Sequence, residues 1–109
     1  MTDKILALST CGSGDEAERV ARGLVESRTA ACVNIVPGVR SIYRWKGVVE
    51  DAREWLLIIK TTRARFDDLR VELVRLHSYE VPECIALPVL DGLTSYLDWI
   101  AEATTGSAD

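Results

Sequence analysis

The chain has 109 residues, a formal net charge of −4, and apolar and charged fractions of 48% and 28%. This length predicts one domain over residues 1–109 with a core of its own, and the composition excludes disorder as the main state. The acidic balance predicts no nucleic-acid partner, and the lack of any apolar run of about 18 residues predicts no membrane partner.

The first expected elements are a strand and an amphipathic helix. The apolar run over 5–10 predicts a buried strand that ends in a turn at 11–14. Ser13 and Glu16 have the spacing of a capping box, so a helix is expected over about 14–28. Its apolar residues recur with helical spacing and form one face: Ala17, Val20, Ala21, Leu24 and Val25.

A long hairpin is expected next. Its first strand covers 31–45, with a bulge or bend at Pro37-Gly38. Lys46-Gly47 has the composition of a two-residue hairpin turn. The return strand covers 48–60 and is apolar on both faces near its end, which indicates that both faces are covered.

The remaining pattern predicts a helix, a strand and a shorter helix. Thr61 or Thr62 is expected to cap the second helix, which ends at 77–79. A strand over 84–90 follows, with Pro88 typical of a sheet edge, and a short helix starts at Thr94. This order predicts an α+β fold, the ferredoxin-like βαββαβ sandwich with a C-terminal helix.

One face of the predicted sheet has no covering layer. Side chains that alternate along the hairpin would place Tyr43 and either Trp45 or Trp55 on that open face. An open apolar face requires a partner, so the pattern predicts a homo-oligomer. For Trp45, which lies beside the hairpin turn, a subunit contact is favoured over a ligand contact.

Two residues are candidates for metal chemistry. Cys11 ends the first strand just before a helix N-terminus, where a thiolate is favoured; the alternative is a small buried apolar residue. His77 is the only histidine, and it either binds a metal or a proton or caps the preceding helix. A Cys, His and Glu cluster, with Glu83 as the carboxylate, suits copper or zinc.

The other polar and sulfur-bearing positions leave alternatives open. Cys32 and Cys84 lie in apolar strands, which favours core packing, and the wide cysteine spacing predicts free thiols in a reducing compartment, the cytoplasm. Lys60 is either an anion or substrate contact or the exposed end of a strand. No nucleophile and base can be paired, so an enzyme is not expected.

Five segments together resemble the CutA divalent-cation tolerance proteins across about residues 5–103. They are residues 30–38 (AACVNIVPG), 41–47 (SIYRWKG), 59–62 (IKTT), 77–83 (HSYEVPE) and 96–99 (YLDW). The resemblance implies a ferredoxin-like homotrimer, similar in architecture to PII signalling proteins, in cytoplasmic tolerance to copper and other divalent cations. It also implies a metal site at Cys11, His77 and Glu83, and family positions in the subunit clefts at Tyr43, Trp45, Lys60 and Tyr79.

Three functions are therefore weighed. The first is a non-enzymatic trimer that binds a divalent metal, copper above all. The second is a PII-like signalling module whose clefts bind a small anionic effector, with Gly12, Ser13, Arg44 and Lys60 as candidates, since a helix N-terminus can hold an anion. The third is a non-catalytic trimeric scaffold for other proteins.

Overall fold

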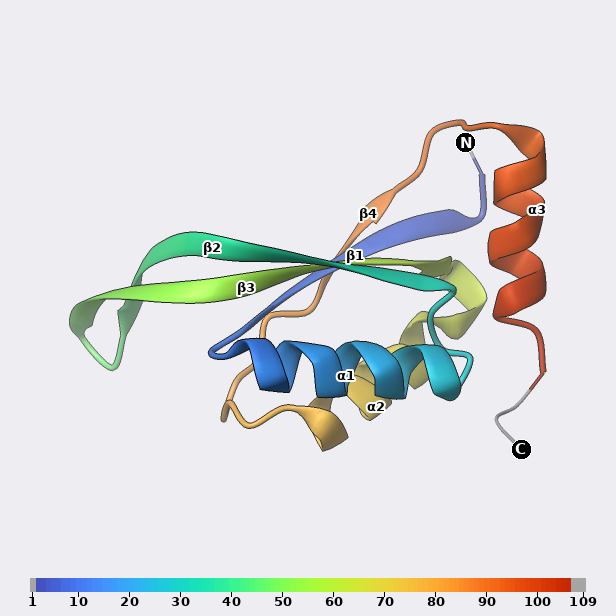
Figure 1. The fold of residues 1–109 in the computed structure, drawn as a ribbon. Helices are drawn as coiled ribbons and strands as arrows, with labels where there is room; N and C mark the ends of the chain where they lie inside the picture. The colour runs from blue at the N-terminus through green and yellow to red at the C-terminus, as the bar shows by residue number, and fades with distance from the viewer. Residues whose placement is uncertain (1, 107–109) are drawn as a thin grey trace.

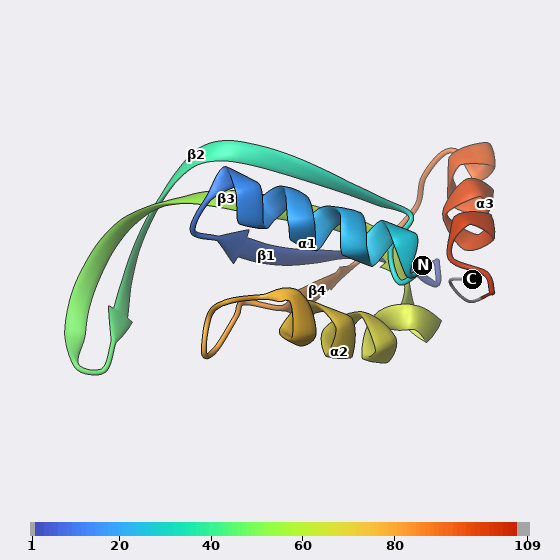
Figure 2. The same cartoon turned by 60° about the horizontal axis from the view of Figure 1, so that its bottom comes forward.

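The computed structural model describes residues 2–106. In chain order its elements are β1 (Lys4–Cys11), α1 (Gly14–Glu26), β2 (Cys32–Trp45), β3 (Val48–Thr62), the 3-10 turn η1 (Arg63–Arg65), α2 (Phe66–Leu76), β4 (Ile85–Pro88) and α3 (Thr94–Ala103). The strands form one antiparallel sheet in the order β2-β3-β1-β4. Figures 1 and 2 show α1 and α2 side by side on one face of it. The predicted ferredoxin-like α+β fold is confirmed.

The core lies between the two central strands and these helices. Successive side chains of β1 alternate between buried and half-buried, so Ala7 and Cys11 face the helices while Thr10 faces away. Leu57 and Ile59 of β3 face the same way as Ala7. The helices complete the core with five fully buried side chains: Ala17, Val20, Leu24, Leu69 and Leu73.

The start of α1 confirms the predicted N-cap. The Ser13 hydroxyl accepts a hydrogen bond from the Glu16 N–H at 3.1 Å. The helix ends at Glu26, two residues earlier than expected, because Arg28 adopts a left-handed backbone with a φ of 61°.

The hairpin of β2 and β3 extends beyond the helices as an arm, which we define as residues 39–54 (Figure 2). Lys46 and Gly47 both have positive φ, 49° and 81°, as a two-residue turn requires. The register shifts between Val36 and Val39, which confirms the predicted bulge. Apolar side chains on the arm remain exposed, among them Ile42, Val48 and Val49. The arm therefore offers apolar surface that its own chain does not cover.

Two boundary predictions were wrong. No side chain caps η1 or α2, because the Thr61 hydroxyl donates instead to the Thr29 carbonyl at 2.7 Å, and Thr62 makes no capping bond. The last strand covers four residues, 85–88, where the sequence predicted 84–90. It pairs only with β1 at the edge of the sheet, as Pro88 indicated.

The sheet register resolves the choice between Trp45 and Trp55 for the open face and corrects the prediction for Cys32. Trp55 pairs with Cys11 across the sheet and packs against the core on the helix side, so Tyr43 and Trp45 are the aromatic residues of the open face. The side chain of Cys32 lies on the open face near Lys60 rather than in the core. Cys84 does pack against the core.

The third helix, α3, lies at the end of the sheet away from the tip of the arm (Figure 1). It contacts β1 and β3, and Ile100 is its buried residue. None of the α-helices within residues 2–106 combines the length and apolarity that a membrane crossing needs.

The packing of the core predicts that substitutions at two neighbouring residues of α2 change the free energy of unfolding by very different amounts. Replacing Leu73 by Ala should lower the free energy of unfolding by about 2–5 kcal/mol, because the fully buried side chain leaves a cavity. Replacing the exposed Val74 by Ala should change it by less than about 0.5 kcal/mol. Urea unfolding at one fixed protein concentration measures both; equal effects would place the core elsewhere.

Candidate functional site

The carboxyl end of β1 meets the C-terminus of α2 in a buried polar cluster. Cys11, Glu16 and His77 each offer a ligand atom there, and these atoms lie within 4.8 Å of one another. The Cys11 Sγ is 3.6 Å from the His77 Nε2, and the His77 Nδ1 is 3.8 Å from the Glu16 Oε1. The structure thus brings together Cys11 and His77, which are 66 positions apart in the chain.

Backbone hydrogen bonds hold the His77 ring in one orientation. His77 is the C-cap of α2, which confirms that the helix ends there. Its Nε2 is 2.7 Å from the Thr10 carbonyl, and its Nδ1 accepts from the Tyr79 N–H at 3.0 Å. The carbonyl can only accept and the N–H can only donate, so these bonds specify the neutral ring with its proton on Nε2.

Glu16 supplies the carboxylate of the cluster. Burial opposes its ionisation, but hydrogen bonds from Ser78 and Gly12 outweigh that effect, and the pKa of Glu16 lies below its ordinary value. One oxygen, Oε2, accepts from the Ser78 N–H at 3.2 Å. The other, Oε1, is buried and has no hydrogen-bond partner within the described residues. This oxygen is free to bind a cation.

The thiol of Cys11 is protonated at neutral pH. Burial, and then the negative charge of Glu16, raise the pKa of Cys11 to about 12. The sequence left two alternatives open for Cys11, a thiolate favoured by the N-terminus of α1 and a small buried apolar residue. The thiolate alternative was wrong, because desolvation and a nearby carboxylate together exceed the effect of the helix dipole, and the side chain is fully buried.

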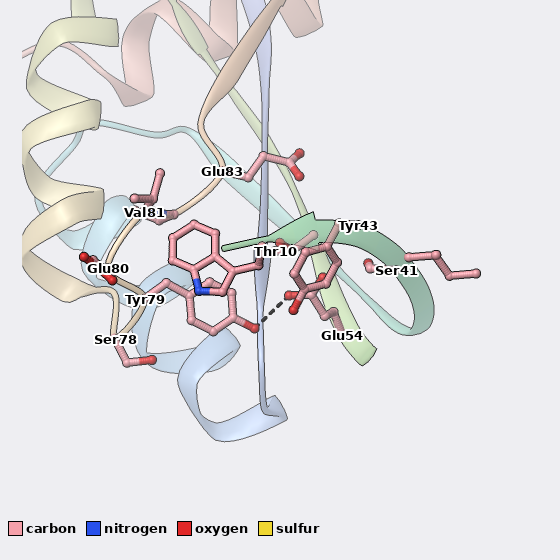
Figure 3. Close-up of a pocket in the computed structure, with 12 residues that line it drawn as sticks. Thr10, Ser41, Tyr43, Glu54, Ser78, Tyr79, Glu80, Val81 and Glu83 are labelled. Atoms are coloured by element: carbon pink, nitrogen blue, oxygen red, sulfur yellow. Dashed lines mark hydrogen bonds between the residues drawn. The ribbon is translucent and has the colours of Figure 1, made fainter. Parts of the chain in front are cut away.

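The third predicted ligand, Glu83, is not a member of this cluster. It lines a pocket between the arm and the segment that joins α2 to β4, together with three residues predicted in part from the resemblance: Tyr43, Trp45 and Tyr79. Figure 3 shows the phenol of Tyr79 directed at the carboxylate of Glu54, to which it donates a hydrogen bond of 2.7 Å. Within the described residues, Glu83 and Tyr79 therefore belong to the pocket and not to the cluster at Cys11.

The residues predicted for an anionic effector do not gather at one place in the described protomer. Lys60 lies on the open face, with its Nζ 3.9 Å from the Cys32 Sγ and 5.9 Å from the centre of the Tyr96 ring. The Arg44 side chain donates to the Gly47 carbonyl within the arm, and the backbone at Gly12 adjoins Tyr79. No lysine or arginine lines the pocket within residues 2–106.

Sequence reasoning missed two carboxylates, Glu16 and Glu54. Glu16 has a local explanation as the third residue of a capping box, which concealed its contact with the distant Ser78. Glu54 lies at the start of the apolar core of β3, and only 5% of it is exposed. A charged residue at the end of an apolar run was the one available signal for Glu54.

The low pKa of Glu16 predicts a pH-dependent contribution to stability. The carboxyl is more acidic in the folded chain than its ordinary value of 4.5, so its charge stabilises the fold above pH 4.5, and this stabilisation is lost as the pH falls through the folded pKa. Glu16→Gln should therefore cost about 1–3 kcal/mol of unfolding free energy at pH 7 and less at pH 3.

Urea unfolding of both proteins at the two pH values measures this difference. Glu18→Gln is the matched control, since Glu18 lies two residues further along α1, is exposed, and pairs only with Arg22 among the described residues. A cost for Glu16→Gln that stays constant between pH 7 and pH 3 would contradict the assignment of a buried, ionised carboxylate.

Comparison with known proteins agrees with this fold. A protein of Thermus thermophilus named divalent-cation tolerance protein CutA is 50% identical over 99 residues, which are 91% of this chain and 96% of that protein. The crystal structure of CutA from Xylella fastidiosa has a TM-score of 0.92 at 42% identity and covers 94% of this chain and 99% of that one. For CutA1 from Oryza sativa the TM-score is 0.91 at 40% identity, with 95% of each chain covered.

The family model described as CutA1 divalent ion tolerance protein matches residues 5–103. This range includes every strand except the first residue of β1, all the helices, the Cys11–His77 cluster and the pocket. The chain belongs to the CutA1 divalent ion tolerance family.

Proposed function

We propose that this protein is a non-catalytic homotrimer that binds a divalent cation, copper above all, as its part in divalent-cation tolerance. The observation that carries the proposal is the buried approach of the Cys11 Sγ to the His77 Nε2 at 3.6 Å. The family name supports the tolerance role, and the donor set supports the kind of metal. Sulfur and imidazole nitrogen are the donors that copper and zinc prefer over hard cations.

The separation of the two donors fits one shared ion. Tetrahedral bonds of about 2.3 Å to sulfur and about 2.0–2.1 Å to nitrogen leave the two donor atoms roughly 3.5 Å apart. Glu16 would supply the third donor, because one ligand atom of each of the three residues lies within 4.8 Å of the others, and the buried Oε1 lacks a hydrogen-bond partner within the described residues. Cys11, His77 and Glu16 would therefore hold the cation.

Binding at this cluster must release the thiol proton of Cys11 and move the ring proton of His77. The thiol is protonated below its pKa of about 12, and the Nε2 of His77 carries the proton that it donates to the Thr10 carbonyl. Coordination through Nε2 would shift that ring proton to Nδ1 at the expense of the hydrogen bond from the Tyr79 N–H, so only the thiol proton is released. The affinity for the cation should therefore rise with pH.

Uncovered apolar surface supports the trimer. The exposed residues of the arm have no covering layer from the same chain, and the family resemblance implies three copies. A two-stranded ribbon is marginally stable by itself, so burial of the arm against a neighbouring copy would supply the apolar contacts that its own chain does not provide.

The free thiols of Cys11, Cys32 and Cys84 support a reducing environment, which is that of the cytoplasm.

Copper titration should separate ligands from bystanders. Cys11→Ala and His77→Ala should each weaken copper binding by at least about a hundredfold, since each removes one of three ligands. Wild-type affinity should rise by about tenfold per pH unit between pH 6 and pH 8 through loss of the thiol proton alone. Competition against a chelator of known affinity measures these constants.

Two conservative variants identify the third ligand. Glu16→Gln should weaken binding, whereas Glu83→Gln, the sequence-based alternative, should leave it unchanged in a site built within one protomer. The reverse result would give Glu83 the role that the sequence predicted for it. Equal affinities for wild type, Cys11→Ala and His77→Ala would remove the cluster from the function.

The assembly is tested separately by light scattering coupled to size exclusion. The expected mass is three times the chain mass of 12.1 kDa. Replacing two exposed apolar residues of the arm, Ile42 and Val49, by Ser should shift the mass toward one chain, because the substitutions weaken burial between copies. A wild-type protein that elutes as a monomer would contradict the proposal.

A further inference from the structure

The pocket between the arm and the segment that joins α2 to β4 has a volume of about 760 Å³. Three aromatic side chains and three carboxylates contribute to its lining: Tyr43, Trp45, Tyr79, Glu54, Glu80 and Glu83. Within the described residues no cationic side chain lines it. Its walls therefore combine aromatic rings with carboxylates, of which Glu80 pairs with Lys46 at the rim while Glu54 and Glu83 make no ion pair within the described residues.

The strongest single feature of the pocket is Glu54. Only 5% of this residue is exposed, yet it makes no ion pair with any residue described. Its one hydrogen-bond partner among the described side chains is the phenol of Tyr79, which donates to the Oε2 at 2.7 Å (Figure 3). Carboxylates are seldom buried without a cation, so a cationic partner is missing from this wall.

The aromatic residues indicate an organic cation. Tyr43 and Trp45 are 43% and 38% exposed, and the faces of such rings attract ammonium groups. The chain itself already makes this pairing next to the pocket, since the Lys46 Nζ lies 5.6 Å from the centre of the Trp45 ring. The same Nζ is 3.6 Å from the Oε2 of Glu80. An ammonium group thus fits between an aromatic face and a carboxylate here.

A metal ion fits this pocket poorly. Hard divalent cations require several oxygen atoms that converge within bonding distance. The cluster at Cys11 is the one group of potential ligands that converges within residues 2–106, and Glu54, Glu80 and Glu83 do not belong to it. A volume of about 760 Å³ is also that of a site for a small molecule rather than a bare ion.

We propose that this pocket binds a small organic ammonium ion, with the charge beside Glu54 and the alkyl groups against Tyr43 and Trp45. The site is distinct from the proposed metal cluster, because it uses a different set of side chains. The carboxylate of Glu54 also disfavours binding of an anionic effector in this pocket, because two negative charges would then lie side by side.

Three probes of similar bulk and different charge test the proposal: tetramethylammonium, tert-butanol and pivalate. Each is titrated at constant ionic strength with a chelator present, so that the result does not depend on the metal site. The indole N–H resonance of Trp45, assigned with Trp45→Leu, should shift saturably with tetramethylammonium, and neither the neutral nor the anionic probe should reproduce this shift. A response to all three probes, or to pivalate alone, would overturn the proposal.

Glu54→Gln tests the role of the charge. The amide oxygen can still accept from the Tyr79 hydroxyl, so the fold is preserved while tetramethylammonium binding should weaken by about tenfold or more. Trp45→Leu removes the reporter resonance, so its binding is measured by titration calorimetry, where it should weaken several-fold. The matched controls Glu102→Gln and Trp99→Leu, both on α3, should leave it unchanged. Undiminished binding in Glu54→Gln, with wild-type thermal unfolding, would refute the assignment.

Discussion

The antiparallel pairing of β1 with β3 is the constraint on which both the core and the polar cluster depend. Its register places Cys11 opposite Trp55, with both side chains directed toward the helices. A shift by one residue would turn Cys11 to the open face and bring Thr10 inward. The same shift would remove Ala7 from the core, so the packing that stabilises the fold also fixes the position of the thiol relative to His77.

The segment after α2 connects the cluster to the pocket. The His77 ring lies against Cys11, while two residues later the phenol of Tyr79 reaches Glu54. The two rings are also in contact, with centroids 4.6 Å apart, and the Tyr79 N–H donates to the His77 Nδ1. A movement of the Tyr79 backbone would therefore alter the hydrogen bond that holds the imidazole, which gives the two sites a direct physical link.

The arm gives assembly and ligand binding a common basis. Tyr43 and Trp45 line the pocket from a two-stranded ribbon whose apolar side chains are exposed. An ion pair on the surface, between Lys46 and Glu80, joins this ribbon to the segment after α2. Such an exposed pair contributes little stability. Burial of the arm in the proposed trimer would hold the aromatic wall in place, so that assembly would preorganise the pocket.

The order of the elements, the Ser13 cap and the turn at Lys46 follow from the amino-acid sequence, because they depend on backbone preferences and hydrogen bonds between near neighbours. Cys11 and His77 are likewise candidates from their positions at the ends of predicted elements. That Glu16 joins them, and that Glu54 faces a pocket, is visible only in the folded chain. A carboxylate accepts hydrogen bonds from whichever donors the fold brings near it. For Glu16 and Glu54 these donors are Ser78 and Tyr79, which lie far from them in the chain.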